Sequence, residues 1–249
     1  MSESSRAHAH KRPTAQAWPL IAVLVLVPVV CWAWIIALAR DMNGPMTGAS
    51  AWMMMLRWDA PHLFLLWAMW AVMMTGMMLP SAAPMILLVR GGARPYVLAL
   101  GYLVAWSAFS VGAVALQWLL ARFLMLTPMM EMSSRTAGAA LLAIAGVYQW
   151  TPLKRACLST CQAPMAFLMR RWRSGSFGAF RMGVEHGLYC VGCCWALMLL
   201  LFAGGVMNLV VIGALTLFVA FEKLMPAGPW SARVSGGALV ALAAWMIAV

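Results

Sequence analysis

Charged residues are scarce in this sequence. Only 9% of its 249 residues are charged, and just 6 of them are acidic. A water-soluble domain of this length needs far more charge to cover its surface, so we exclude a soluble globular protein. There is no series of roughly ten-residue segments that alternate between apolar and polar side chains, which argues against an outer-membrane barrel. The GxxxxGK[ST] phosphate-binding loop is also missing, which disfavours ATP-driven pumping by this chain alone.

Hydrophobic residues make up 65% of the chain and fall into runs long enough to cross a bilayer, for which about 20 residues are needed. We expect an all-α, polytopic transmembrane helical bundle of six to seven spans, near residues 18–39, 62–88, 96–124, 136–152, 184–204, 206–225 and 234–249. Residues 1–17 are predicted to be a cytoplasmic basic tail, and residues 18–249 a single membrane domain. The main connections in this domain are an outer loop at 40–61 and an inner loop at 153–183.

The formal net charge of +11 is explained by where the basic residues lie. With the N-terminus in the cytoplasm, all but four of the 17 lysines and arginines lie on the cytoplasmic side. The four on the outer side are Arg40, Arg57, Arg122 and Arg135. This asymmetry is what the positive-inside rule predicts. We therefore expect a multi-pass protein of a bacterial inner membrane, with the lipid bilayer as its partner and no nucleic acid.

Five of the six cysteines fall close together in the sequence, at Cys157, Cys161, Cys190, Cys193 and Cys194. The first two are four residues apart, so on a helix they share a face. Cys190 and Cys193 form a CxxC, and His186 precedes Cys190 by about one helical turn. Soft thiolates beside an imidazole suit Cu(I) and, as a second choice, zinc. A buried packing role and a redox motif remain alternatives for these cysteines.

Methionine is abundant, with 23 residues. In the second span Met69, Met73 and Met77 recur every four residues, with Met74 and Met78 on the adjacent face. The prolines that follow, at positions 80 and 84, are expected to interrupt this helix and free carbonyl groups inside the bundle. A ladder of thioethers suits the relay of a soft cation, although methionines at helical spacing also pack as an ordinary core.

Two carboxylates, Glu185 and Glu222, lie in or beside predicted spans, where ionisable groups are costly. We expect both toward the cytoplasmic side, where they would tune the charge of a metal site. The alternative is an interfacial position, with Glu222 paired to Lys223 or to an inner arginine. Gly183 and Gly187 form a GxxxG before the cysteines, which predicts that the fifth span lies at the centre of the bundle.

Several strings resemble, in the same order, the motifs of a bacterial family of predicted metal-binding integral membrane proteins, classed as a domain of unknown function. They are MMTGMMLPS at 73–81, GYLVAW at 101–106, YQWTPLK at 148–154, CLSTCQAP at 157–164, residues 187–198 with Cys190 and Cys193-Cys194-Trp195, and Glu222-Lys223. The resemblance covers residues 60–225 or so. It implies an expectation of metal binding and no established activity.

Our leading hypothesis is an integral inner-membrane protein that binds or transports a soft metal ion, copper first. Its main ligands would be the five clustered cysteines, with Glu185, His186 and Glu222 tuning the charge. The secondary ligands or relay would be Met73, Met74, Met77 and Met78. The sequence offers no catalytic residue, so we do not expect an enzyme, and a partner membrane or metal-handling protein would receive the metal.

Two alternatives come from other classes of protein. In a membrane thiol-disulfide oxidoreductase, Cys157/Cys161 and Cys190/Cys193 would be two dithiol pairs that exchange electrons. In a scaffold subunit of a larger membrane complex, the same motifs would only hold helices together.

Overall fold

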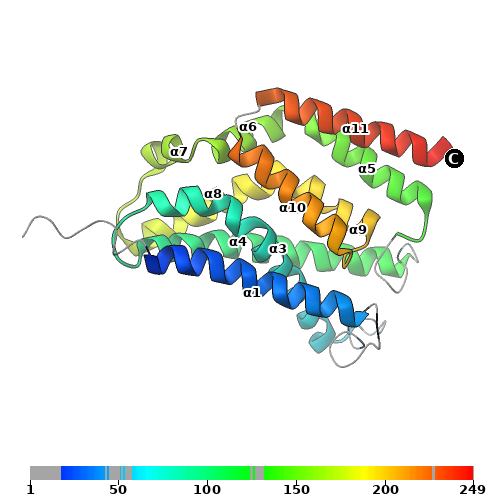
Figure 1. Cartoon of the computed structure of the whole chain (residues 1–249), viewed down its shortest axis with the longest axis horizontal. Coiled ribbons are helices and arrows are strands. Elements are labelled where there is room, and N and C mark those ends of the chain that lie inside the picture. The colour runs from blue at the N-terminus through cyan, green and yellow to red at the C-terminus, as the bar shows by residue number, and fades with distance from the viewer. Residues whose placement is uncertain are drawn as a thin grey trace, which may run out of the picture.

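The computed structural model describes residues 18–42, 44, 51, 53, 58–123, 126, 132–225 and 228–248. Within these ranges the chain is helical and has no β-strand, which confirms the predicted all-α class. The predicted tail 1–17 and most of the predicted outer loop 40–61 lie outside the described residues. The helices, labelled as in Figure 1, are α1 (Trp18–Met42), α3 (Ala60–Leu88), α4 (Arg94–Arg122), α5 (Arg135–Gln149), α6 (Pro152–Gln162), α7 (Pro164–Arg171), α8 (Gly175–Met198), α9 (Leu200–Gly204), α10 (Leu209–Leu224) and α11 (Gly228–Ala248).

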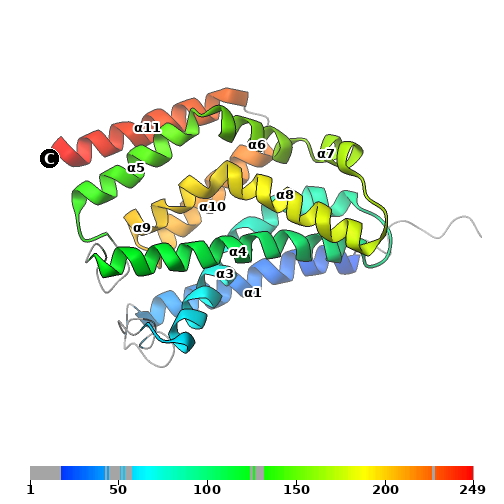
Figure 2. The ribbon, with the colours of Figure 1, turned by 180° about the vertical axis from the view of Figure 1, so that it is seen from behind.

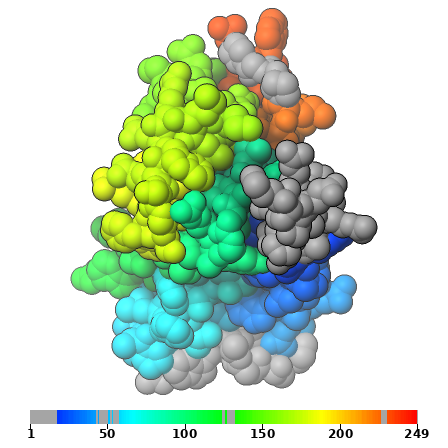
Figure 3. All heavy atoms as spheres, turned by 90° about the vertical axis from the view of Figure 1, so that its left-hand side faces the viewer, coloured from blue at the N-terminus to red at the C-terminus, as the bar shows by residue number. Residues whose placement is uncertain are grey.

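The long helices run roughly along one direction and pack side by side (Figures 1 and 2). Contacts pair α1 with α3, α3 with α4, α4 with α8, α6 with α8, and α5 with α11. The start of α1, the α3–α4 turn and the α7–α8 connection lie at the same end of the molecule. We call this the arginine end, because it carries Arg90, Arg94, Arg170 and Arg171. Figure 3 views the molecule from this end and shows the α6–α7 segment in yellow-green beside the α3–α4 turn.

Among the described residues, five stretches of helix are long and apolar enough to cross a membrane: 18–42, 60–88, 94–122, 175–204 and 230–248. The other two predicted spans, 136–152 and 206–225, correspond to α5 and α10, which have only 15 and 16 residues. At the rise of an α-helix they reach roughly 22–24 Å, less than the roughly 30 Å of a hydrocarbon core. Of the six to seven predicted spans, five thus have helices of sufficient length within the described residues, and the number of spans stays a prediction.

The predicted inner loop at 153–183 is mostly helical. It contains α6 after its first residue, all of α7 and the first nine residues of α8. Pro152 and Pro164 both stand at helix starts, where a missing N–H costs nothing. Thr151 caps α6 by accepting from the Lys154 backbone N–H at 3.2 Å. Together α5, α6 and α7 cover the length that one long helix would cover (Figure 2).

The helix α3 is continuous through Pro80 and Pro84, contrary to the predicted interruption. Neighbouring side chains hydrogen-bond to its backbone in the same region. The carbonyl oxygen of Met78 accepts from the Ser81 hydroxyl at 2.8 Å and from the Tyr102 hydroxyl at 3.0 Å. Proline is tolerated inside such a helix when neighbouring groups supply partners for freed backbone atoms.

The backbones of α4 and α8 touch through glycines, as the GxxxG predicted. A Cβ at Gly183 would lie 2.0 Å from the Leu98 carbonyl oxygen, and one at Gly101 would lie 2.2 Å from the Phe180 carbonyl oxygen. One turn further along α8, a Cβ at Gly187 would lie 2.6 Å from the Ala105 Cβ. Such distances leave no room for any side chain, so these glycines set the spacing of the two helices.

Substituting Gly183→Ala should destabilise the fold, because the new methyl group must push α4 and α8 apart. We expect a loss of about 1–3 kcal/mol in the free energy of unfolding, measured by thermal unfolding in detergent. The matched control is Gly213→Ala on α10, where a Cβ meets nothing within 4 Å. Equal unfolding temperatures for the two variants would contradict the close packing described here.

Candidate metal centre

The Cys190 side chain lies where five helices meet, and it contacts residues from several of them. Its Sγ accepts a hydrogen bond from the Lys223 ammonium of α10 at 2.8 Å and lies 2.9 Å from the Tyr102 hydroxyl of α4. The Cys161 thiol of α6 lies near enough to Cys190 and Cys193 to interact electrostatically with both. Cys190 is 1% exposed, so these contacts are closed to bulk solvent.

The two cysteines that follow on α8 complete a cluster of thiols. Cys193 and Cys194 both donate to the Cys190 carbonyl oxygen, at 3.1 and 2.9 Å. We call Cys161, Cys190, Cys193 and Cys194 the sulfur cluster. It combines a helical turn of α8 with one cysteine of α6, so both predicted cysteine blocks contribute to it.

The Lys223 ammonium is the charged neighbour of the sulfur cluster. Besides Cys190 it donates to the Ser81 hydroxyl at 3.1 Å and lies 3.9 Å from the Met78 Sδ. Burying an ammonium without partners is costly, so these contacts are needed to keep Lys223 inside the bundle. Cys190 is the partner among them that can supply a negative charge.

A second lysine, Lys154 of α6, is also buried and pairs with Glu222. The Nζ–Oε2 distance is 2.7 Å, and the two side chains are 1% and 2% exposed. This corrects the expectation that Glu222 pairs with Lys223 or with an arginine. The positive-inside argument counted Lys154 and Lys223 as charges on the cytoplasmic side, outside the bundle. Both are instead buried inside it. The Gln162 amide donates to the Glu222 carbonyl oxygen at 2.7 Å, so α6 is fastened to α10 twice.

His186 and Cys157 lie next to the sulfur cluster without joining it through a hydrogen bond. His186 is buried on the same helix as Cys190, with its ring 5.3 Å from Phe167 and 6.0 Å from Tyr102. Its Nδ1 has no hydrogen-bond partner among the described residues. Cys157 packs against Gly192, where a Cβ would lie 2.8 Å from the cysteine Sγ.

Glu185 belongs to an arginine network instead of the sulfur cluster. Its carboxylate lies 3.1 Å from Arg173, 3.4 Å from Arg181 and 3.9 Å from Arg171. The Glu185 side chain is 20% exposed, and the three arginine side chains are 35–56% exposed. We therefore interpret Glu185 as an anchor of the α7–α8 connection.

The four methionines predicted as secondary ligands are all buried on α3. Met73, Met74 and Met78 are 0% exposed and Met77 is 1% exposed. Met78 is the one that the structure brings to the sulfur cluster, through its 3.9 Å contact with Lys223. For Met73, Met74 and Met77 the structure shows burial in the core.

The thiols are not arranged as a finished metal site. Within the part of the chain that the structure describes, no group of three or more His, Cys, Asp or Glu side chains is placed to hold a metal ion. The donor chemistry nevertheless suits a soft ion, because the thiols of Cys193 and Cys194 lie one turn from Cys190 on α8 and the Met78 thioether lies nearby, 3.9 Å from Lys223. Binding would require the Cys193 and Cys194 side chains to turn away from the Cys190 carbonyl.

Sequence reasoning missed Tyr102, Ser81 and the role of both lysines. The relevant signal was available for the lysines, since each stands next to a long apolar run. The positive-inside argument counted them as loop charges and so hid their burial. The serine and the tyrosine lay in the motif strings at 73–81 and 101–106, but only the helix packing shows their contacts with Lys223 and Cys190.

These features define an all-helical protein with a buried soft-metal donor set. The chain belongs to the family described as PpoB2, copper chaperone, whose family model matches residues 67–246. No curated protein and no solved structure matches it. Family membership supports copper handling in general terms and confirms the metal-related part of the resemblance seen in the sequence.

The Lys154–Glu222 pair should be important for stability. Substituting Glu222→Leu leaves a buried ammonium without its counter-charge, which costs about 3–5 kcal/mol. The double variant Lys154→Met/Glu222→Leu should recover most of this loss, because both charges are removed. Unfolding in detergent measures both effects.

Glu185→Gln is the control for this comparison, because its ion pairs are partly solvated and worth about 1 kcal/mol or less. A Glu222→Leu variant as stable as Glu185→Gln would contradict the buried pair. A double variant no more stable than Glu222→Leu would contradict charge compensation as its basis.

Proposed function

We propose that this protein is an integral membrane copper chaperone that binds Cu(I) at the sulfur cluster and hands it to a partner metal-handling protein. The observation that carries the proposal is the grouping of three further thiols, Cys161 of α6 and Cys193 and Cys194 of α8, around Cys190. Thiolates and thioethers favour Cu(I) among biological metals. Membership of a copper chaperone family supports the same cargo.

Charge balance favours copper held by two thiolates of the sulfur cluster. A Cu(I) ion with two thiolate ligands carries one net negative charge. The Lys223 ammonium beside Cys190 would neutralise this charge inside the bundle. Zinc prefers four ligands in a tetrahedron, and no such group is preformed within the described ranges.

A membrane location is supported by the outer surface of the bundle. Large apolar side chains are exposed along several helices, including Val30 at 65%, Phe64 at 64%, Val111 at 58% and Leu217 at 73%. Exposed apolar area of this extent is unstable in water and suits lipid. With the arginine end in the cytoplasm, the basic residues follow the positive-inside rule, consistent with the inner membrane of a bacterium.

The buried methionines of α3 supply a route for copper to or from the sulfur cluster. Met69, Met73, Met77 and Met78 follow α3 from its first half to the cluster, and all are 0–1% exposed. Thioether exchange along this stripe needs no ATP, consistent with the missing phosphate-binding loop. The direction of copper transfer, and the partner protein that receives the copper, would depend on where Cu(I) is supplied and consumed.

The thiol oxidoreductase alternative is less well supported. Disulfide exchange needs an accessible thiolate, whereas Cys190, Cys193 and Cys194 are only 1–2% exposed. A pure scaffold role does not explain the buried Lys223–Cys190 contact, because an apolar pair would hold the helices together better.

The Cys193→Ser/Cys194→Ser double variant tests the proposal, because serine hydroxyls can keep the hydrogen bonds to the Cys190 carbonyl. We expect the purified wild type to hold stoichiometric copper under anaerobic conditions. The double variant should bind Cu(I) about 10–100-fold more weakly or lose it entirely. Elemental analysis and competition with a coloured Cu(I) chelator measure both quantities.

Cys31→Ser is the matched control, since Cys31 is a buried cysteine of α1 outside the sulfur cluster. Unchanged copper in the double variant would refute the site. Stoichiometric zinc in place of copper would refute the cargo. A mixed disulfide with a partner protein and no bound metal would favour the oxidoreductase.

A further inference from the structure

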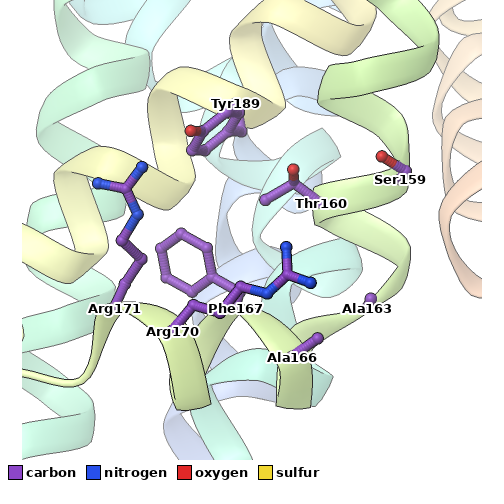
Figure 4. Close-up of a pocket in the computed structure, with 8 residues that line it drawn as sticks. All are labelled: Ser159, Thr160, Ala163, Ala166, Phe167, Arg170, Arg171 and Tyr189. Carbon is purple, nitrogen blue, oxygen red and sulfur yellow. The ribbon is translucent and has the colours of Figure 1, made fainter.

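A pocket of about 290 Å³ opens between α6, α7 and α8 at the arginine end of the molecule (Figure 4). Arg170 and Arg171 of α7 line it together with Tyr189 of α8 and Thr160 of α6, and Phe167 supplies an apolar wall. In the view of Figure 4 the two arginine side chains lie on either side of the Phe167 ring. No acidic side chain is among the described residues that line the pocket, so its lining is positively charged.

The guanidinium groups of the pocket are available to a ligand. In the described part of the chain Arg170 forms no ion pair. Arg171 lies 3.9 Å from the Glu185 carboxylate, which is closer to Arg173 and Arg181, at 3.1 and 3.4 Å. One carboxylate therefore faces three arginines, which leaves an excess of positive charge beside the pocket. Guanidinium groups bind phosphate oxygens through paired hydrogen bonds, so the pocket suits a phosphate group.

The start of α7 adds backbone donors to the same pocket. Ala163 and Ala166, at the beginning of this helix, belong to the pocket lining. The helix has no side-chain cap, and its first turn closes with the hydrogen bond from the Phe167 N–H to the Ala163 carbonyl oxygen at 3.0 Å. The N–H groups of Met165 and Ala166 come before that bond and have no acceptor within the helix. Such helix starts favour anions, in agreement with the charge of the two arginines.

The surface beside the pocket is apolar, which favours a lipid headgroup over a free anion. Met165, Met169 and Trp172 follow the spacing i, i+4 and i+7, so they share one face of the α7 segment. All three are more than half exposed, as is Phe177 at the start of α8. An apolar face beside basic residues is typical of a helix that lies in the membrane interface. Basic pockets on the cytoplasmic side of membrane helices bind anionic headgroups.

We infer that this pocket binds the phosphate group of an anionic phospholipid, whose acyl chains would lie against the exposed apolar face of the α7 segment. The inference rests on the proposed membrane location and is independent of copper, since no cysteine is among the described residues that line the pocket. The Ser159 and Thr160 hydroxyls donate to the Ala156 carbonyl oxygen at 2.9 and 3.2 Å, so they can accept from hydroxyl groups of the headgroup. The lining offers no carboxylate to the ammonium group of a zwitterionic lipid.

The experiment measures lipid binding to detergent-purified, delipidated protein by native mass spectrometry. The lipid probes are phosphatidylglycerol, which is anionic and carries hydroxyl groups, and the zwitterionic phosphatidylcholine. Inorganic phosphate is added as a competitor that tests for a free anion. The pocket variant is Arg170→Gln/Arg171→Gln. The matched control is Arg90→Gln/Arg155→Gln, which removes the same charge from two exposed arginines outside the pocket lining.

The inference predicts that the pocket variant binds phosphatidylglycerol roughly 10–30-fold more weakly than wild type, because two guanidinium contacts with the phosphate are lost. The control variant should match wild type. Phosphatidylcholine should bind wild type more weakly than phosphatidylglycerol does, and its affinity should be the same for all three proteins. An excess of inorganic phosphate should not displace phosphatidylglycerol, because it lacks acyl chains that contact α7.

Equal affinity of wild type and pocket variant for phosphatidylglycerol would overturn the inference. An equal weakening in the control variant would also overturn it, since general surface charge would then explain the binding. Displacement of the lipid by inorganic phosphate would overturn it as well and assign the arginines to a free anion. Release of wild type from cell membranes by alkaline carbonate would refute the proposed membrane location itself, which keeps the two failures distinguishable.

Discussion

The close contact between α4 and α8 is the constraint on which the candidate site depends. Gly101, Gly183 and Gly187 lack the Cβ atoms that would hold the two backbones apart. Tyr102 follows the first of these glycines, and Cys190 comes about one turn after the last. The same contact therefore brings the Tyr102 hydroxyl to 2.9 Å from the Cys190 sulfur. A wider spacing of the helices would separate the phenol from the thiol and open the cluster to lipid or water.

Charge compensation inside the bundle is the second requirement. The neighbouring residues Glu222 and Lys223 of α10 point to different partners, Lys154 on α6 and Cys190 on α8. In a medium of low dielectric constant each charge needs a partner nearby, so α10 can occupy only a narrow range of positions. The two contacts thus hold α6, α8 and α10 together around the thiols. The same arrangement leaves the Lys223 ammonium beside the sulfur cluster. There it would balance the net negative charge of a Cu(I) ion held by two thiolates.

The general character of the fold follows from the sequence, because it depends on local properties. Long apolar runs predict helices, and the small residues Gly183 and Gly187 predict a central α8. The sequence was less informative where neighbouring helices decide the outcome. The sequence did not predict where the short helices α6 and α7 begin, because Pro152 and Pro164 break helices in their interior but begin them equally well. The continuous α3 depends on bundle contacts near Pro80 and Pro84 that no local pattern encodes.

For the site, the sequence predicted a CxxC at Cys190 and Cys193 about one turn after His186, and the structure places Cys161 of α6 near this CxxC. The spacing could not show which cysteine lies at the centre, nor that Cys157 turns toward Gly192. Those outcomes depend on the rotation of α6 against α8. Tyr102 and Lys223 were missed for the same reason, since their importance comes from contacts between helices distant in the sequence.

The most direct test of the account is copper K-edge X-ray absorption on the Cu(I)-loaded protein in detergent. The account predicts a first coordination shell dominated by sulfur, with few ligands, as expected for thiolates of the sulfur cluster. The same spectrum should persist in Cys31→Ser, whose cysteine lies outside this cluster. A shell made mainly of nitrogen or oxygen would contradict the central claim that Cys161, Cys190, Cys193 and Cys194 hold the copper.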